Sequence, residues 1–452
     1  MALPWTARGV LVIAGGILVH LSLGTHYTFG NISPYIVSYI RERSKPSDLN
    51  YEQAMWIYAL AQSFHGIAMY VGGFIDRKIG PSWTTLLGGA LVSFGVGLTY
   101  FTIMQSFYAV LITYGLMFGI GVGVAYAPPL AAAMRWFPNR KGLVSGCIVG
   151  GFGFGAFVFN PIQTAFVNPD NLSPNTTDPD DPGNLYFDQK SVLDRTPYCF
   201  IMLGVVYFSM QIIGSCMVRN PPVESEDESG EREKLIVKEG EEETKKPVDE
   251  RSAGVTMGPG KMIRTRAFWT LWCTYLFNTQ TQVLISTLYK AFGQTFIADD
   301  LFLALVGSFS SVCNALGRVM WGYFADRFSY KKTMLVICAV NTFFMLTLKL
   351  TDRAGEAMFL IWVCGVFLSF SGNFALFPTA TARSFGQEYI GMNYGLMFTA
   401  TMMSAITGSF LANALADSIG WLGLFVLCAL FSAAAFVLTL TFNVKTPAGK
   451  NI

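Results

Sequence analysis

One arginine inside an otherwise apolar stretch has the most clearly defined chemistry in this sequence. Arg318 follows Ser311 and Asn314 at spacings that place the three residues on one face of a helix, with Asn314 one turn from the guanidinium. An arginine side chain presents a planar fork that can bind a carboxylate through two hydrogen bonds. We therefore expect that Arg318, with Asn314 and Ser311 on the same face, can bind a carboxylate.

A structural role for Arg318 is the main alternative. Arg318 lies only eight residues before Asp326, which is roughly 12 Å along a helix, and Asp326 is expected at the end of that helix. The long arginine side chain can therefore extend toward the aqueous boundary or brace a neighbouring helix. In that case the protein carries a neutral or zwitterionic metabolite.

Several other polar and aromatic residues are expected to line a central cavity beside Arg318. They are His26, Tyr27, Asn31, Gln62, His65, Tyr126, Asn278, Gln280, Gln282, Phe370 and Phe374. His20, His26 and His65 are also candidates for moving a proton, because histidine changes charge near neutral pH. The alternative for each histidine is a hydrogen bond between helices.

The elements that position these residues are predicted to be membrane-spanning helices. Of the 452 residues, 52% are hydrophobic and only 13% are charged, and the mean hydropathy is +0.43. Stretches of about 20 apolar residues, long enough to cross a bilayer, recur along the chain. We expect an all-α membrane protein with twelve transmembrane helices in two six-helix bundles, at residues 9–39, 53–75, 83–104, 107–134, 142–166, 198–218, 267–289, 301–325, 333–350, 356–381, 391–415 and 420–442.

Catalysis is not expected. The sequence has no pair of carboxylates within a helix, no metal-spaced set of cysteines and histidines, and no phosphate-binding loop beside a strand. We therefore expect no enzyme activity, no cofactor and no metal. The net charge of +2 gives no indication of nucleic-acid binding, and the expected surroundings are the lipid bilayer.

Two hydrophilic inserts divide the chain into an N-terminal bundle (1–219, with an extracellular loop at 167–197), a disordered cytoplasmic linker (220–263) and a C-terminal bundle (264–452). Most of the 31 lysines and arginines fall on one side of the predicted helices, so both termini are expected in the cytoplasm.

Asn171 and Asn175 begin glycosylation motifs in the extracellular loop. The linker contains the segment Glu231–Ile236, which has the form of an acidic dileucine sorting signal. It also contains Ser225, whose acidic neighbours suit phosphorylation. The alternative is a solvated linker without either function. The expected location is the plasma membrane, with an endolysosomal membrane as the alternative.

A repeated motif suggests a gate. Gly72, Asp76 and Arg77 in the first half are matched by Gly322, Asp326 and Arg327 in the second half, and Arg135 is likewise matched by Arg383. The glycines allow neighbouring helices to approach closely, and each aspartate can accept hydrogen bonds from the N-terminus of a facing helix. These eight residues are expected to form a latch on the cytoplasmic face, whereas a simple topogenic turn would explain only the charges.

The sequence resembles the Major Facilitator Superfamily, and in particular its oxalate:formate antiporter and monocarboxylate transporter branch. The resemblance covers the chain apart from its two inserts and rests on Arg135-Trp-Phe-Pro-Asn-Arg140-Lys-Gly142-Leu, Asn314-Ala-Leu-Gly-Arg318 with Trp321-Gly322, and Asn393-Tyr-Gly-Leu-Met-Phe398. It implies secondary active transport by alternating access, and it implies that Arg318 contacts the anionic substrate.

The departures from that branch narrow the expected substrate. The oxalate:formate antiporter carries a second cation in its eleventh helix, but the corresponding stretch here, from Phe398 to Met403, contains none. Asn31 stands where monocarboxylate transporters have a lysine, and Asn314 stands where they have an acidic residue. One unpaired cation suits one negative charge, so a monocarboxylate is expected in preference to a dianion. Coupling to protons or to a counter-anion stays open, and so does the possibility that the protein is a membrane sensor or scaffold that transports nothing.

Overall fold

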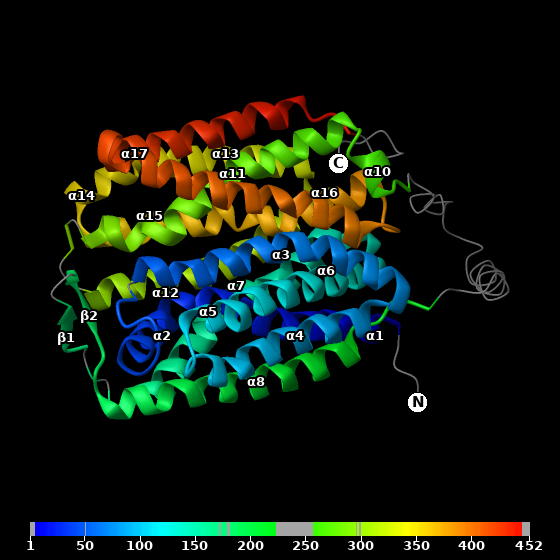
Figure 1. The fold of residues 1–452 in the computed structure, drawn as a ribbon. Helices are drawn as coiled ribbons and strands as arrows, with labels where there is room; N and C mark the ends of the chain where they lie inside the picture. Colours follow the sequence, from blue (N-terminus) through cyan, green and yellow to red (C-terminus); the bar gives the residue numbers. More distant parts are fainter. Residues whose placement is uncertain are drawn as a thin grey trace, which may run out of the picture.

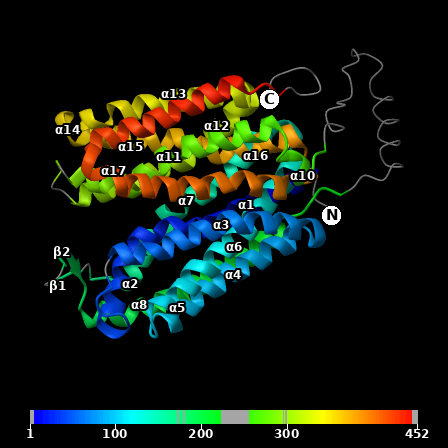
Figure 2. The same ribbon diagram turned by 45° about the horizontal axis from the view of Figure 1, so that its top comes forward.

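The protein is a bundle of long helices in two groups, as seen in a computed structural model that describes residues 5–49, 51–170, 172, 174–178, 181–222, 256–294, 296–297 and 300–444. Figure 1 shows the N-terminal helices, in blue to green, beneath the C-terminal helices, in bright green through yellow to red, with the long axes nearly parallel. Figure 2 shows the same two groups from a second direction. The expected architecture of two six-helix bundles is confirmed.

The N-terminal bundle contains six membrane-spanning units. The first is formed by α1 (Trp5–Leu23), the short helical turn Gly24–Thr28 and α2 (Phe29–Arg43). The others are α3 (Tyr51–Ile79), α4 (Pro81–Thr102), α5 (Phe107–Val110) joined through a π-helical segment (Leu111–Met117) to α6 (Phe118–Trp136), α7 (Lys141–Val167) and α8 (Lys190–Met217).

The C-terminal bundle repeats this plan. It consists of α11 (Arg266–Gln294), α12 (Asp300–Arg327), α13 (Tyr330–Thr347), α15 (Glu356–Phe370) continued by α16 (Gly372–Phe385), and α17 (Ile390–Thr441). The long α17 supplies two spans, because Gly420 has a non-helical backbone with a positive φ of 60°. The short helices α10 (Pro259–Met262) and α14 (Thr351–Ala354) lie at the two ends of the bundle.

The molecule has two distinct ends, which we name the termini end and the hairpin end. At the termini end lie the start of α1, the end of α17 and α10; at the hairpin end lie α14 and a small antiparallel pair of strands, β1 (Thr176–Asp178) and β2 (Asp181–Tyr186) (Figure 1). In that pair Thr176 lies opposite Tyr186. The repeated motifs are all at the termini end.

Eight stretches among the described residues are individually long and apolar enough to cross a membrane. They are Ala7–Arg43, Pro81–Ile103, Phe107–Trp136, Pro138–Val167, Lys190–Met217, Tyr330–Ala354, Glu356–Phe385 and Ser418–Thr441. The other four spans are α3, α11, α12 and the first part of α17, and three of these four lie where the bundles meet: α3 packs against α17, and α12 packs against α7.

Glycines allow the two bundles to approach at backbone distance. A Cβ added at Gly142 of α7 would lie 2.3 Å from the carbonyl oxygen of Gly322 in α12, and a Cβ at Gly73 of α3 would lie 2.2 Å from the backbone of Gly391 in α17. Real Cβ atoms do not come so close to backbone atoms. Any larger residue at these positions would therefore push the bundles apart.

Two details differ from the sequence-based expectation. The helix expected at 198–218 begins at Lys190, because Pro197 is accommodated inside α8 rather than preceding it. The insert expected as a loop at 167–197 therefore ends earlier, and part of it forms the β1–β2 hairpin. The linker segment that contains Ser225 and Glu231–Ile236 lies outside the described residues.

Candidate substrate-binding site

Arg318 is completely buried where α12 of one bundle meets α7 of the other. Its Nε donates a hydrogen bond of 2.9 Å to Oδ1 of Asn314, and its Nη1 donates one of 2.9 Å to the carbonyl oxygen of Val149 on α7. Its Nη2 has no hydrogen-bond partner. The guanidinium thus connects the two bundles and keeps one nitrogen available.

No carboxylate neutralises this arginine among the described residues. The ion pairs of the described chain are Arg43–Asp194, Arg77–Glu388, Lys349–Asp352 and Arg383–Asp326, and none includes Arg318. Moving an unpaired charge out of water costs several kcal/mol. A guanidinium that is buried without a counter-charge therefore favours the entry of an anion.

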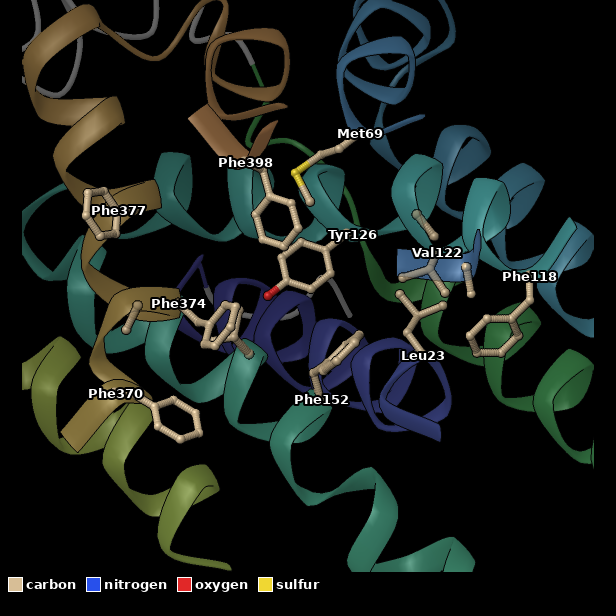
Figure 3. Close-up of a cluster of buried hydrophobic side chains, with 14 of the residues drawn as sticks. Leu23, Met69, Phe118, Val122, Tyr126, Phe152, Phe370, Phe374, Phe377 and Phe398 are labelled. Carbon is tan, nitrogen blue, oxygen red and sulfur yellow. The ribbon is translucent and has the colours of Figure 1, made fainter. Parts of the chain in front are cut away.

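Aromatic rings from both bundles surround the guanidinium. Its Cζ lies 4.3 Å from the ring centre of Phe374 on α16 and 5.7 Å from that of Phe152 on α7. Figure 3 shows these rings with Tyr126 of α6 and Phe398 of α17, and the Tyr126 hydroxyl points toward Phe374. Tyr126 also interacts electrostatically with Arg318. These faces stabilise a cation and exclude water from it.

Buried polar atoms without partners gather around the same rings. They are both ring nitrogens of His65 and Nε2 of His20. The buried hydroxyls of Tyr275 and Tyr394 lie close by and interact with each other. The ring centre of His20 lies 4.8 Å from that of Tyr126, and Phe398 contacts the rings of His65, Tyr275 and Tyr394. Buried polar groups are normally hydrogen-bonded. Such a concentration of unpartnered atoms is typical of a place that receives a ligand or water.

The structure brings together only some of the residues expected at the site. Arg318, Asn314 and Tyr126 lie together, whereas the Ser311 hydroxyl donates to the carbonyl oxygen of Gly307 in its own helix. The side chain of Asn31 donates to Asn160 and Gln163 and accepts from Thr164, so α7 occupies both ends of its amide.

The other expected residues contact various partners in the two bundles. His26 stacks on Tyr58 and Phe118 and lines a separate cavity of about 10 Å³, room for about one water. Tyr27 meets Phe152 edge to face, Gln62 is half-buried, and Gln282 has an unpartnered Oε1.

Asn278 donates to Asn373 and accepts from Asn341 within the C-terminal bundle, and Gln280 donates to Thr407. A second cavity, at the termini end, is lined by Lys261 and Arg264 and not by Arg318. The Arg318 side chain is fully buried in this conformation.

The second copy of the repeated motif joins the two bundles at the termini end. Asp326 of α12 accepts hydrogen bonds of 2.9 Å from the backbone N–H of Gly142 and 2.8 Å from that of Leu143, at the start of α7. Arg383 of α16 forms an ion pair of 2.5 Å with the same carboxylate. Arg327 is exposed.

The first copy has different contacts. Oδ1 of Asp76 is buried without a hydrogen-bond partner, and its charge interacts with Arg135, whose Nη1 donates to Asn220. Gly72 packs against the backbone of Val124. Arg77 lies 3.7 Å above the ring of Tyr389 and pairs with Glu388 at 3.1 Å, so α3 is connected to the start of α17. Both copies therefore make contacts between the bundles at the termini end, through different atoms.

Comparison with known proteins decides the family. A family model described as Major Facilitator Superfamily matches residues 15–296 and 271–452. The chain belongs to the Major Facilitator Superfamily. As a member of this superfamily it is a membrane transporter and not an enzyme.

Relatives of this superfamily member include carriers named for organic anions. The chain is 32% identical to the apicoplast pyruvate carrier 1 of Toxoplasma gondii, covering 95% of this chain and 87% of the carrier. It is 24% identical to the oxalate:formate antiporter of Oxalobacter formigenes, covering 84% and 80% of the two chains. Among solved structures, the proton:xylose symporter XylE has the same fold, with a TM-score of 0.71 at 12% identity over 99% of this chain and 98% of XylE.

Sequence reasoning missed several components of the centre. The missed side chains come from three helices that meet only in the fold: Phe152 on α7, Tyr275 on α11, and Tyr394 and Phe398 on α17. A signal was available for two of them, because Tyr394 and Phe398 lie in a segment that carries the resemblance to the superfamily branch. Phe370, also expected at the site, is buried against the ring of Phe367.

Proposed function

We propose that this protein is a secondary active transporter that moves small organic anions, preferably monocarboxylates, across a membrane by alternating access. The observation that carries the proposal is Arg318, a buried cation at the contact between the bundles, with a free Nη2 and no carboxylate partner in the described chain. A single carboxylate would supply both the missing charge and the missing hydrogen-bond acceptor.

The relatives support this class of substrate. Two of the matched proteins are named as a pyruvate carrier and an oxalate:formate antiporter, and a shorter match, over 25% of this chain, is to human monocarboxylate transporter 12. Formate and pyruvate each carry one carboxylate, which suits the one uncompensated cation. Asn314 and Tyr126 contact or face the same guanidinium, so we assign them to the site together with Arg318.

The places where the two bundles are joined support alternating access. The contacts of Asp326 with α7 and of Arg77 with α17 link the two bundles at the termini end, and Nη1 of Arg318 links them at the centre. A carboxylate that binds both terminal nitrogens of Arg318 through two hydrogen bonds would compete with Val149 for Nη1. Binding therefore weakens one inter-bundle bond while it neutralises the buried charge, and this change favours rearrangement of the bundles.

The motif residues Gly72, Asp76, Arg77, Arg135, Gly322, Asp326, Arg327 and Arg383 are assigned to a gate at the termini end. The positive charge of the loops supports a cytoplasmic position for this end. The hairpin end then faces the outside or a lumen, where Asn175 is exposed and can be glycosylated, whereas Asn171 lies outside the described residues. A plasma-membrane location fits this orientation.

Uptake by proteoliposomes tests the proposal. Labelled pyruvate, formate, oxalate and the zwitterion alanine are offered with and without a pH gradient or an internal counter-anion. Wild-type protein should take up the monocarboxylates, and Arg318→Gln should abolish this uptake. Arg353→Gln is the charge-matched control, because Arg353 is exposed and lies in α14 at the hairpin end.

Each alternative corresponds to a distinct result. Uptake of alanine alone, unaffected by Arg318→Gln, would replace the anion carrier by a carrier of a zwitterion in which Arg318 is structural. Absence of transport for every solute, with protein that is correctly folded and inserted, would favour a sensor or scaffold. Loss of uptake in Arg353→Gln as well would show that the variants act through general destabilisation and would remove the support for a specific role of Arg318.

A further inference from the structure

His65 occupies an unusual position for a buried histidine. It lies on α3, its side chain is 3% exposed, and neither of its ring nitrogens has a hydrogen-bond partner. By contrast, Nδ1 of the neighbouring His20 lies 3.0 Å from the carbonyl oxygen of Gly16. A neutral imidazole has one donor and one acceptor nitrogen, and leaving both unpaired costs about 1–3 kcal/mol for each.

Rings from three other helices enclose the imidazole. Its centre lies 4.8 Å from that of Phe398 on α17, 5.3 Å from that of Tyr126 on α6 and 6.3 Å from that of Phe152 on α7. His20 and His26 also interact with it electrostatically. His65 therefore lies in the contact between the bundles and not in the core of one of them.

The same aromatic residues connect His65 with Arg318. The ring centre of Phe152 lies 5.7 Å from the guanidinium Cζ of Arg318 and 6.3 Å from the imidazole centre of His65, and Tyr126 interacts with both groups. The centre thus offers two kinds of polar group around one set of rings. The arginine provides charge-assisted donors for a carboxylate, and the histidine provides a neutral donor and acceptor for an uncharged oxygen.

We propose that His65 is a specificity-determining residue that hydrogen-bonds the oxygen on carbon 2 of the substrate while Arg318 binds its carboxylate. This inference rests on the proposed transport of monocarboxylates and deepens it, because it predicts a preference for acids with a 2-oxo or 2-hydroxy group. The oxygen of such a substrate pairs with one nitrogen of His65, since a 2-oxo group accepts from the N–H nitrogen and a 2-hydroxy group can instead donate to the other; without a substrate both nitrogens stay unpaired. An acid of the same length without that oxygen leaves them unsatisfied, and so binds less well.

The proposal is tested by comparing pyruvate and L-lactate with propionate, which has three carbons and no oxygen on carbon 2. Wild-type protein in proteoliposomes should show a KM for propionate about tenfold above that for pyruvate, the factor expected for one lost hydrogen bond. His65→Phe keeps a ring against Phe398 and Tyr126. It should raise the KM for pyruvate to the level of propionate and leave the KM for propionate within about twofold.

A second variant separates hydrogen bonding from packing. His65→Gln retains a donor and an acceptor and should restore part of the preference for pyruvate. If His65→Phe does not fold, a preference for pyruvate retained by His65→Gln but absent from His65→Leu supports the proposal. An unchanged ratio of the KM values in His65→Phe, or equal values for pyruvate and propionate in the wild-type protein, would overturn it. Failure of the wild-type protein to transport any of the acids would instead refute the proposed function.

Discussion

The contact between Asp326 and the start of α7 should control how often the termini end is open. Asp326→Ala removes two hydrogen bonds, to Gly142 and Leu143, that cross from one bundle to the other. The ion pair of Asp326 with Arg383 lies within the C-terminal bundle, so it can persist whether the gate is open or closed. Only the two backbone hydrogen bonds therefore contribute to the difference in free energy between the two states.

The size of the effect follows from these two bonds. A hydrogen bond to a charged group contributes about 1.5–3 kcal/mol, and the bonds share one partly exposed carboxylate, so we take about 2–4 kcal/mol for the pair. Since about 1.4 kcal/mol corresponds to a factor of ten, the substitution should shift the equilibrium toward the open termini end by roughly 30- to 700-fold. The conservative Asp326→Asn retains one carbonyl acceptor without the charge and should produce a smaller shift.

Distances between spin labels would measure this shift. Labels at Trp83 on α4 and Lys332 on α13, both exposed near the termini end on opposite bundles, should report a longer distance in Asp326→Ala than in the parent protein, after the native cysteines have been replaced. The control is Asp194→Asn, because Asp194 pairs with Arg43 inside the N-terminal bundle. An unchanged distance distribution in Asp326→Ala would refute the assigned role of this contact.

Three further predictions concern substitutions of single residues. Asn314→Asp places a carboxylate one helical turn from Arg318, so it should weaken monocarboxylate binding at least tenfold without loss of fold, which titration calorimetry and thermal unfolding would check; unchanged affinity would count against a free cation. Gly322→Leu should reduce transport and open the termini end, because a Cβ there would lie 2.2 Å from the Gly142 carbonyl oxygen, whereas Gly97→Leu, which has no atom within 4 Å of its Cβ, should leave transport intact. Asn175→Gln should increase the gel mobility of protein from a eukaryotic membrane by the same amount as glycosidase treatment; equal mobility of the two forms before treatment would exclude use of this site.

The sequence predicts the helices better than it predicts their contacts. The period of apolar residues and the face shared by Asn314 and Arg318 are local properties, and they agree with the helices and the hydrogen bond in the structure. The bond from Arg318 to Val149 joins residues 169 positions apart, and the rings of Phe152 and Phe374 reach the same guanidinium from different helices. No spacing in one helix can specify which face of another helix meets it.

The repeated motif shows a second limit of reasoning from spacing. Its two copies predict the same chemistry for Asp76 and Asp326, yet only Asp326 accepts bonds from the start of α7, while Asp76 keeps an unpartnered oxygen. On α3 the contact with the other bundle is made by Arg77, which pairs with Glu388 and lies over the ring of Tyr389. Asn31 is a similar case, since its position suggests the cavity but its amide is bonded to α7. Side-chain partners depend on rotamers and on conformational state, which a residue pattern does not encode.

Titration of pyruvate into the purified protein tests the central claim most directly, because it asks whether Arg318 binds a monocarboxylate. We predict saturable binding to the wild-type protein and to Arg353→Gln, and binding weaker by roughly 10- to 150-fold in Arg318→Gln, as expected for a lost hydrogen bond from a charged group. Equal affinity of the wild-type protein and Arg318→Gln for pyruvate would contradict the account.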